Sequence, residues 1–328
     1  MPNVVGLLTL IAMSGLLVYA SIRAARVRSR VARWVGIGLS VVLATAVGAL
    51  SVLTIIGLVK AQARHAPVPN IKVVGTAEQI ERGRAIATSF CGACHAKNGP
   101  LTGGSDIGEH FAIPIGSFVS TNLTAAGPLR RWSDGEIFRA IRNSVAADRR
   151  WLLVMSYTNA GKLSDQDIQA VIAYLRNQPG AGVATVEPPD GLNLLGLIML
   201  GAGMLPSGKP VVTTAITAPP KGPTVPYGAY ILSYQDCREC HGARLTGGVK
   251  GQLGPIGPDL NLVKEWQRDE FIATMRTGVD PYGHALNEQK MPWRPIGRMD
   301  DDELGAMYEY LTHLPASQTT ATNQDVGS

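Results

Sequence analysis

Two short stretches decide the fold of this 328-residue chain: FCGACH at residues 90–95 and DCRECH at residues 236–241. Each places a Cys-x-x-Cys pair directly before a histidine, His95 in the first and His241 in the second. The two motifs contain all four cysteines of the chain: Cys91, Cys94, Cys237 and Cys240. Any interpretation of the cysteines therefore has to explain the complete motif, histidine included, and explain it twice.

The sequence around the motifs also occurs twice. Four landmarks recur in the same order: GRAIATSFCGACH (83–95) with GAYILSYQDCRECH (228–241), LTGG at 101–104 and 245–248, WSDGEIFRAIRNSV (132–145) with WQRDEFIATMRTGV (266–279), and LSDQDIQAVIAYLRNQP (163–179) with MDDDELGAMYEYLTHLP (299–315). The last pair aligns without a gap. This order predicts a duplicated domain of about 100 residues per copy.

The local signals within each repeat are helical. Capping boxes are predicted where Thr, Ser or Asp precedes Gln or Glu by three residues, at Thr76, Ser133 and Asp300. Two apolar stripes with helical spacing predict core-facing helices: Ile168, Val171, Ile172 and Leu175, and Leu304, Met307, Tyr308 and Leu311. The segments between are rich in Gly and Pro without sustained alternation, so we expect no strands. The predicted fold class is all-α.

The N-terminal segment predicts a membrane hairpin. Residues 4–22 and 34–59 are uncharged, mostly apolar and long enough to cross a bilayer as helices. The loop between them, RAARVRSRVAR, holds five arginines, and a short loop this basic stays in the cytoplasm. A cleaved signal peptide is the alternative for the first run, but MPNVV lacks the positive start of such signals. Everything after residue 59 is then expected outside the cytoplasm.

Charge excludes nucleic acid as a partner. The chain has a net charge of +5, but residues 1–65 contain seven basic residues and no acidic one. The remainder has 23 basic and 25 acidic residues, so its net charge is slightly negative. This balance does not provide the basic surface that binding to phosphate groups requires.

Four chemistries can use a Cys-x-x-Cys pair. A structural zinc site needs four ligands in one place, whereas these pairs lie about 145 residues apart in corresponding positions of two repeats. A redox dithiol of the thioredoxin kind expects a βαβ context. A disulfide within each pair leaves the histidine unexplained. Covalent haem attachment uses all three residues: two thioethers and an axial histidine. We therefore predict two haem c groups, held by all four cysteines.

The axial ligands are predicted from the same repeat. His95 and His241 supply one side of each iron. Met155 and Met291 share the offset of 136 residues that aligns the last helices, so we predict them as the sixth ligands. His284 and His110 are the alternatives. Pro258 is predicted to support His241 through its backbone carbonyl, with Pro114 a looser match in the first repeat.

With these residues in view, each repeat resembles a class I c-type cytochrome domain. The resemblance covers about 76–180 and 225–315: a helix running into CxxCH, a Gly/Pro-rich loop, a Met ligand and a C-terminal helix ending in YL…LP. The whole is similar to membrane-anchored dihaem cytochromes c, and more distantly to multihaem cytochrome subunits of membrane alcohol dehydrogenases. It departs from the simplest form in its two-helix anchor and in Met155, which no Pro follows.

The predicted organisation is a transmembrane hairpin followed by two tandem cytochrome c domains. The boundaries are 1–60 for the hairpin, 61–75 for a linker, 76–182 for the first domain, 183–224 for an interdomain linker, 225–316 for the second domain and 317–328 for a disordered tail. The segment 191–206 is too short and Gly-rich to span a membrane, and is expected to pack between domains or on the membrane surface.

The resemblance implies an electron carrier, not an enzyme, on the outer (periplasmic) face of the cytoplasmic membrane. Its expected partners are redox proteins or a respiratory or photosynthetic complex, with lipid around the hairpin. The alternatives are a dihaem peroxidase or other haem enzyme, or the cytochrome subunit of a dehydrogenase.

Overall fold

The computed structural model describes residues 2–96, 99–183, 190–206, 208–250, 252 and 255–315. The predicted tail at 317–328 lies outside them. The chain forms two compact units, and neither is one continuous stretch. Unit 1 comprises Met1–Lys72, Lys97–Tyr157 and Pro179–Thr213; unit 2 comprises Val73–Ala96, Thr158–Gln178 and Thr214–Ser328. The predicted domain boundaries follow the repeat instead, and they stay a prediction.

Most of the regular structure is helical, as predicted. Unit 1 contains α1 (Pro2–Ala24), α2 (Arg30–Gln62), α5 (Asp134–Asn143), α7 (Leu194–Gly201), the strands β1 (Gly116–Phe118) and β2 (Asp190–Leu192), and 3₁₀ turns at Ile107–His110, Pro128–Arg131 and Met155–Tyr157. Unit 2 contains α3 (Ala77–Ile86), a π-helical turn at Ala87–Cys91, α4 (Gly92–His95), α6 (Asp165–Asn177), α8 (Val225–Tyr234), α9 (Cys237–His241), α10 (Arg268–Thr277), α11 (Trp293–Ile296), α12 (Asp301–Thr312), and 3₁₀ turns at Ala160–Lys162 and Leu260–Glu265.

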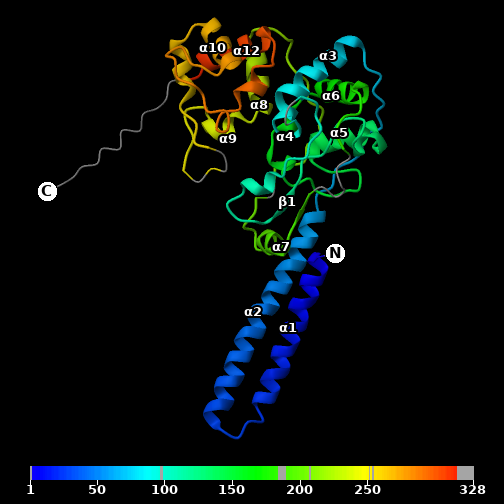
Figure 1. Cartoon of the computed structure of the whole chain (residues 1–328), viewed down its shortest axis with the longest axis vertical. Coiled ribbons are helices and arrows are strands. Elements are labelled where there is room, and N and C mark those ends of the chain that lie inside the picture. The colour runs from blue at the N-terminus through cyan, green and yellow to red at the C-terminus, as the bar shows by residue number, and fades with distance from the viewer. Residues whose placement is uncertain are drawn as a thin grey trace, which may run out of the picture. The chain divides into compact units, whose positions relative to one another are not determined.

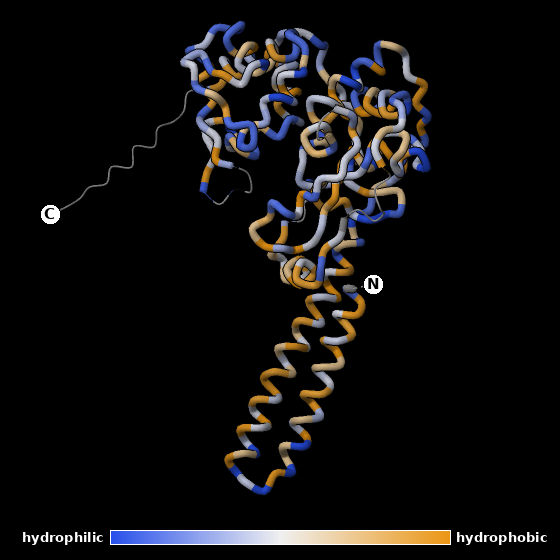
Figure 2. The backbone as a smooth tube through the Cα atoms, viewed as in Figure 1, coloured by the Kyte–Doolittle hydropathy of each residue, from blue (hydrophilic) through white to orange (hydrophobic). Residues whose placement is uncertain are grey.

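Helices α1 and α2 of unit 1 form an antiparallel hairpin (Figure 1). Both are apolar along their length, with a polar turn between them (Figure 2), and both are long and apolar enough to cross a membrane. Small residues let the helices approach, as where the Ser14 hydroxyl donates to the Ala44 carbonyl at 3.2 Å. At the helical rise, the 33 residues of α2 span about 50 Å and the 23 of α1 about 35 Å, so α2 is the longer helix by about 15 Å.

Helix α7 packs across the part of α2 nearest its C-terminal end, near the N-terminal end of α1 (Figure 1). Glycines make the crossing close: a Cβ on Gly57 would lie 2.0 Å from the Leu197 carbonyl oxygen, and one on Gly201 would lie 2.0 Å from that of Leu53. The Lys60 ammonium donates to the carbonyls of Leu200 and Gly201 at 3.1 and 3.2 Å, which satisfies the last turn of α7. Within the 191–206 segment, α7 therefore packs on α2.

The expectation that the chain has no strands is wrong. Strands β1 and β2 pair antiparallel, with Gly116 opposite Leu192 and Phe118 opposite Asp190. They are three residues long, too short to show a period of two in the sequence. The pair fixes the start of α7 and helps close a small core, which contains Ile115, Phe118, Trp151, Leu153, Met199 and Leu200.

Unit 2 contains the first and last helices of both repeats. Helix α3 crosses α6, and α8 crosses α12. Corresponding glycines make both crossings close: a Cβ on Gly83 would lie 1.8 Å from the Ala170 carbonyl oxygen, and one on Gly228 would lie 1.9 Å from that of Ala306. These are the first residues of the aligned GRAIATSFCGACH and GAYILSYQDCRECH segments, so the duplication extends to backbone contacts.

The predicted helix signals are confirmed. Thr76, Ser133 and Asp300 each form a complete capping box. Both predicted apolar stripes face a core, with Ile168, Ile172 and Leu304 fully buried and Tyr308 partly buried. Matching bridges also recur after α5 and α10, between Val145 and Trp151 and between Val279 and Ala285.

Candidate haem attachment sites

Helix α8 leads into the second motif, which forms the short helix α9. The turn between them is sharp because Asp236 adopts a left-handed conformation with φ 30°. Asp236 is held there from another segment of unit 2: its carboxylate accepts from the backbone and side-chain nitrogens of Asn159 at 2.7 and 2.6 Å. The motif is thus presented at the end of a buried helix whose residues Ile231, Leu232 and Tyr234 are at most 1% exposed.

The His241 ring is held in one orientation. Its Nδ1 lies 2.8 Å from the Pro258 carbonyl oxygen, and since a carbonyl can only accept, Nδ1 carries the proton. The other ring nitrogen, Nε2, is then the one that can bind a metal. Burial lowers the pKa of His241, which favours the neutral ring that ligation requires. The predicted support of His241 by Pro258 is confirmed.

A glycine loop closes over this motif. The Gly257 amide donates to the Cys240 carbonyl at 2.9 Å, and the Gly247 amide to that of His241 at 3.0 Å. A Cβ on Gly257 would lie 2.7 Å from the His241 Nδ1, so only glycine lets the loop pass so close to the ring.

The first motif follows a π-helical turn at Ala87–Cys91 and forms α4. Single π turns are frequent at functional sites, where the extra residue reorients the side chains that follow. Here the turn directly precedes Cys91. His95 ends α4. The Pro114 carbonyl of unit 1 accepts from the side chain of Asn193 at 2.7 Å.

All four cysteines are free thiols in the structure and are partly buried. Burial raises the pKa of Cys91 and of Cys237 to about 12 in each case, and it also raises the pKa of Cys94 and Cys240. A redox dithiol needs at least one thiol with a lowered pKa, and none of the four has one. The raised pKa values therefore do not favour a redox dithiol at either motif.

Met155 and Met291 occupy corresponding turns that are half-buried. Met155 begins the 3₁₀ turn Met155–Tyr157 of unit 1. Met291 lies just before α11 of unit 2, where its carbonyl accepts from the Trp293 amide at 2.8 Å. Their role as sixth ligands stays a prediction. The alternative His284 has an exposed ring 3.0 Å from the Asp280 carboxylate, and His110 is exposed as well.

Unit 2 has a buried polar group that suits the acidic side chains of a haem. Among the described residues, the indole nitrogen of Trp293 is buried and has no acceptor. The Trp293 ring lies against Gly278, where an added Cβ would be 2.2 Å from its Cε2. A buried donor without an acceptor is costly, and a propionate carboxylate is an acceptor of the required kind. Together with the orientation of His241, this donor fits a haem bound in unit 2.

The segments that lead into the two motifs contact each other within unit 2. The Phe90 ring, next to Cys91, meets the Tyr234 ring edge to face at 5.9 Å between centroids. The Arg298 guanidinium, from the second repeat, donates to the Thr88 carbonyl of the first at 3.3 Å. No periodicity in the sequence predicts this contact, because the partners lie more than 140 residues apart.

A buried ionic cluster joins the four helices α3, α6, α8 and α12 of unit 2. Arg82 of α3 pairs with Asp167 of α6 at 2.8 Å and with Glu303 of α12. The Tyr230 hydroxyl of α8 donates to Asp167 at 2.5 Å and accepts from the Ser164 amide at 2.8 Å. We did not predict this cluster. The available signal was two acids, Asp167 and Glu303, placed at the same position of the two aligned last helices.

Comparison with known proteins agrees with this geometry. The family model described as Cytochrome c matches residues 80–179, and that described as Cytochrome C oxidase, cbb3-type, subunit III matches residues 227–311. Each match contains one attachment motif. The chain therefore carries two cytochrome c domains.

Several relatives are subunits of dehydrogenases. The chain is 28% identical over 270 residues to the cytochrome c subunit of a quinone alcohol dehydrogenase from Gluconobacter oxydans, covering 72% of this chain and 55% of the relative. It is 25% identical to the fructose dehydrogenase cytochrome subunit of Gluconobacter japonicus, covering 85% and 62%. It is 26% identical to one of the subunits of nicotinate dehydrogenase from Pseudomonas putida, covering 76% and 22%. The chain thus spans less than two thirds of these relatives.

The molecule is a dihaem c-type cytochrome. Two haem c groups match its two CxxCH-type motifs, which contain Cys91 and Cys94 and Cys237 and Cys240. The attachment of the haems to these cysteines stays a prediction. The predicted class, fold and cofactors are confirmed, and cytochrome c domains are electron carriers.

Proposed function

We propose that this chain is the membrane-anchored cytochrome subunit through which a dehydrogenase passes its electrons to an acceptor in the membrane. Three relatives are subunits of dehydrogenases, and two of them are cytochrome subunits. The chain itself has the two features a relay needs: two haem c groups and an apolar hairpin suited to a bilayer. When bound, haem c supplies a one-electron Fe(II)/Fe(III) couple.

The contact between Phe90 and Tyr234 carries this proposal. It joins the segments directly before the two motifs within one unit, so we expect the two haems to be bound near each other and not on independently moving parts. Electron tunnelling falls steeply with distance, and a fixed short separation favours transfer between the two. The Asn159 and Arg298 hydrogen bonds add two more fixed points between the repeats.

The protein's own groups set the properties of each iron. We assign His95 and His241 as proximal ligands, and Met155 and Met291 as the sixth ligands. Methionine sulfur favours the reduced iron and so raises the potential, which suits an acceptor of dehydrogenase electrons. A closed sixth position also leaves no site for peroxide, so a carrier is favoured over a dihaem peroxidase.

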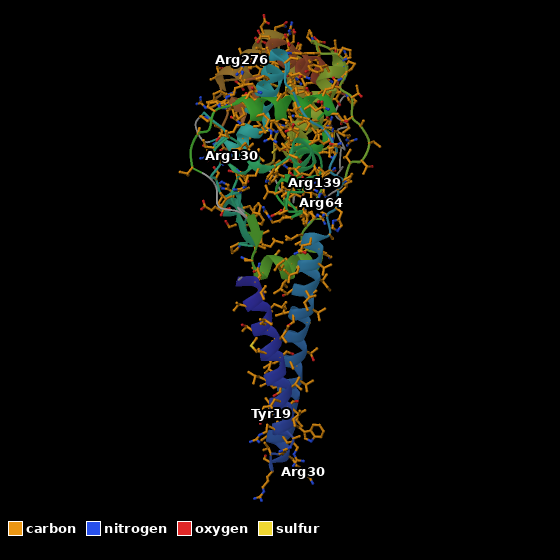
Figure 3. All side chains as sticks on the ribbon, turned by 90° about the vertical axis from the view of Figure 1, so that its right-hand side faces the viewer. Tyr19, Arg30, Arg64, Arg130, Arg139 and Arg276 are labelled. Carbon is orange, nitrogen blue, oxygen red and sulfur yellow. The ribbon has the colours of Figure 1, made fainter. Side chains whose placement is uncertain are left out.

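The hairpin is proposed to cross the membrane twice, with the arginine-rich turn in the cytoplasm and both cytochrome domains on the periplasmic side. The turn and the helix ends beside it contain Arg23, Arg26, Arg28, Arg30 and Arg33, and no acid. Figure 3 shows Arg30 and Arg64 at opposite ends of α2. Covalent haem c attachment takes place outside the cytoplasm, which requires the same orientation.

The proposal is tested by purifying the chain from its own membranes in mild detergent. We expect a dehydrogenase to travel with it, and the substrate of that enzyme to reduce both haems, read as the reduced-minus-oxidised α-band. A variant with all four cysteines changed to alanine is the control; it keeps the anchor but should show no band. If the chain purifies alone and no dehydrogenase substrate reduces it in intact membranes, the proposed partner is wrong.

A further inference from the structure

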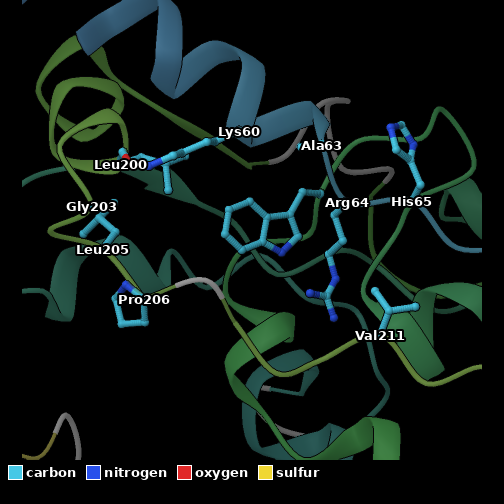
Figure 4. A pocket seen from close by; sticks show the side chains of 10 residues that line it. Lys60, Ala63, Arg64, His65, Leu200, Gly203, Leu205, Pro206 and Val211 are labelled. Atoms are coloured by element: carbon cyan, nitrogen blue, oxygen red, sulfur yellow. Dashed lines mark hydrogen bonds between the residues drawn. The ribbon is translucent and has the colours of Figure 1, made fainter.

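A cavity of about 690 Å³ opens in unit 1 at the C-terminal end of α2. Helix α2 and the residues after it form one wall, and α7 with the chain that follows it forms another (Figure 4). Its lining residues are Lys60, Ala63, Arg64, His65, Trp151, Leu200, Gly203, Leu205, Pro206 and Val211. The volume is in the range of pockets that bind small molecules.

Lys60 and Arg64 give this cavity positive charge, and His65 also lines it. No carboxylate is among the described residues of its lining. Residues 1–65 contain seven basic residues, of which five lie in the hairpin turn or in the helix ends beside it; the other two are Lys60 and Arg64. The turn arginines are explained by orientation in the membrane, whereas these two face a cavity at the opposite end of the same helix.

Both cations have hydrogen-bonding capacity left. Lys60 donates to two carbonyls of α7, which uses two of its three ammonium protons. The Arg64 Nε donates to the Asn143 carbonyl at 2.6 Å, which leaves its four Nη protons. Among the described residues, neither cation forms an ion pair with a carboxylate. Burial lowers the pKa of Arg64, so its charge lacks part of the stabilisation that water gives.

Trp151 adds an unmet donor. It is 8% exposed and lines the cavity, and within the described part of the chain its indole N–H has no acceptor. Leu200, Leu205, Pro206 and Val211 make the rest of the lining apolar. The cavity thus combines an anion-binding wall with an apolar one. This is the lining expected for an amphipathic molecule with a negative head.

We infer that this cavity binds the phosphate headgroup of an anionic phospholipid from the outer leaflet, with Arg64 and Lys60 on the phosphate and the apolar wall along the start of an acyl chain. The inference rests on the proposed placement of the hairpin, because α2 then delivers the cavity to the membrane surface, where such lipids are at hand. A quinone fits less well, since a neutral carbonyl does not balance two cations. The site goes beyond electron transfer and assigns the chain a lipid-binding role.

The test measures lipid retained by the full-length haem-loaded protein. The protein is delipidated in mild detergent, titrated with phosphatidylglycerol or phosphatidylcholine, and analysed by native mass spectrometry. We expect one phosphatidylglycerol to bind in preference to phosphatidylcholine, and more weakly at high salt. Arg64→Gln and Lys60→Gln should each weaken it about tenfold, and Arg64→Lys less, because each change removes a charge-assisted hydrogen bond.

Arg26→Gln is the matched control, since it removes one arginine of the same segment from the far end of the hairpin. It should bind phosphatidylglycerol as the wild type does. If a charge variant fails to incorporate its haems, Trp151→Phe tests the site instead, because it keeps an aromatic ring and removes the indole donor. Its affinity for phosphatidylglycerol should be lower than that of the wild type. Equal binding of the two lipids, equal loss in Arg26→Gln, or displacement by inorganic phosphate at millimolar concentration would overturn the assignment. So would a quinone that competes regardless of Arg64.

Discussion

Individual atoms around His241 decide how the second iron is held. Pro258 determines which ring nitrogen carries the proton, and Gly257 permits the approach because it lacks a side chain. The sequence pattern predicted Pro258 in this role, because IGPDL follows the motif at a distance that a closing loop can span. It did not indicate Gly257, since the need for a glycine appears only where backbone and ring meet.

Replacing Gly257 with alanine should disturb the ring without removing a ligand. The added Cβ would lie 2.7 Å from Nδ1, closer than side chains tolerate, so the loop or the ring must shift and the bond to Pro258 must lengthen. We expect both haems to remain attached, with altered low-spin EPR g-values for one of them. Gly38→Ala, with nothing within 4 Å of the added atom, should leave the spectrum unchanged. An unaltered spectrum in Gly257→Ala would mean that the ring is not held by this loop.

Met291→Ala tests the predicted sixth ligand of the second haem. Without the thioether the iron should lose a ligand that favours its reduced state, so the potential of one haem should fall and that haem should bind CO at neutral pH. Redox titration and CO-difference spectra check this. The control is Met204→Ala, which changes a methionine that is 66% exposed. An unchanged potential would show that Met291 is the wrong residue, and CO binding by the wild type would favour a haem enzyme.

At the level of secondary-structure elements, helices pack in pairs, and glycines at the crossings determine how closely the two helices of a pair approach. Gly83 and Gly228 do this at the same place in the two repeats, and Gly57 and Gly201 do it for α2 and α7. Helix positions, caps and core stripes were predictable because they depend on residues within four positions of each other. The crossings, the β1–β2 pair and the docking of α7 were not, because each depends on contact between distant segments.

Gly228→Leu should separate α8 from α12. A Cβ at that position would lie 1.9 Å from the Ala306 carbonyl oxygen, so even alanine requires the helices to move apart, and leucine requires more. We expect a fall in thermal stability, followed by far-UV circular dichroism, and reduced haem incorporation at the second motif. Gly15→Leu is the counterpart on α1, where nothing lies within 4 Å of the added atom. Equal stability of the two variants would show that the crossing is not tight.

The ionic cluster of Arg82, Asp167 and Glu303 should be sensitive to the loss of its cation. Arg82→Ala leaves two carboxylates in unit 2 whose side chains are only 9% and 2% exposed, and breaking a buried pair in this way costs about 3–5 kcal/mol. Denaturant unfolding of the detergent-solubilised protein, monitored by the haem absorbance, measures the loss. Glu81→Ala breaks the exposed Glu81–Arg84 pair and should cost about 0–1 kcal/mol. A cost for Arg82→Ala as small as that of Glu81→Ala would refute the structural role of the cluster.

Across the whole molecule, two of the sequence's strongest signals belong to different environments. We propose that the cysteine motifs receive haem outside the cytoplasm and that the arginine-rich turn stays inside it. Both placements hold together if the apolar hairpin crosses the membrane twice. The repeat predicted both cytochrome domains, but not that the end helices of both would pack in one unit, since a self-comparison shows what is duplicated and not what its copies contact.

Single added cysteines test the proposed orientation in the full-length protein, because we expect haem attachment to occupy the four native cysteines. Val68→Cys places a thiol after α2, where the side chain is 45% exposed, and Val27→Cys places one in the turn, where it is 40% exposed. In spheroplasts, a membrane-impermeant maleimide should label residue 68 and not residue 27, and permeabilised cells should label both. The haem content of each variant, by the pyridine haemochrome assay, controls for folding. Labelling of residue 27 in intact spheroplasts would reverse the proposed topology. The cavity at Lys60 and Arg64 would then no longer lie at the outer leaflet.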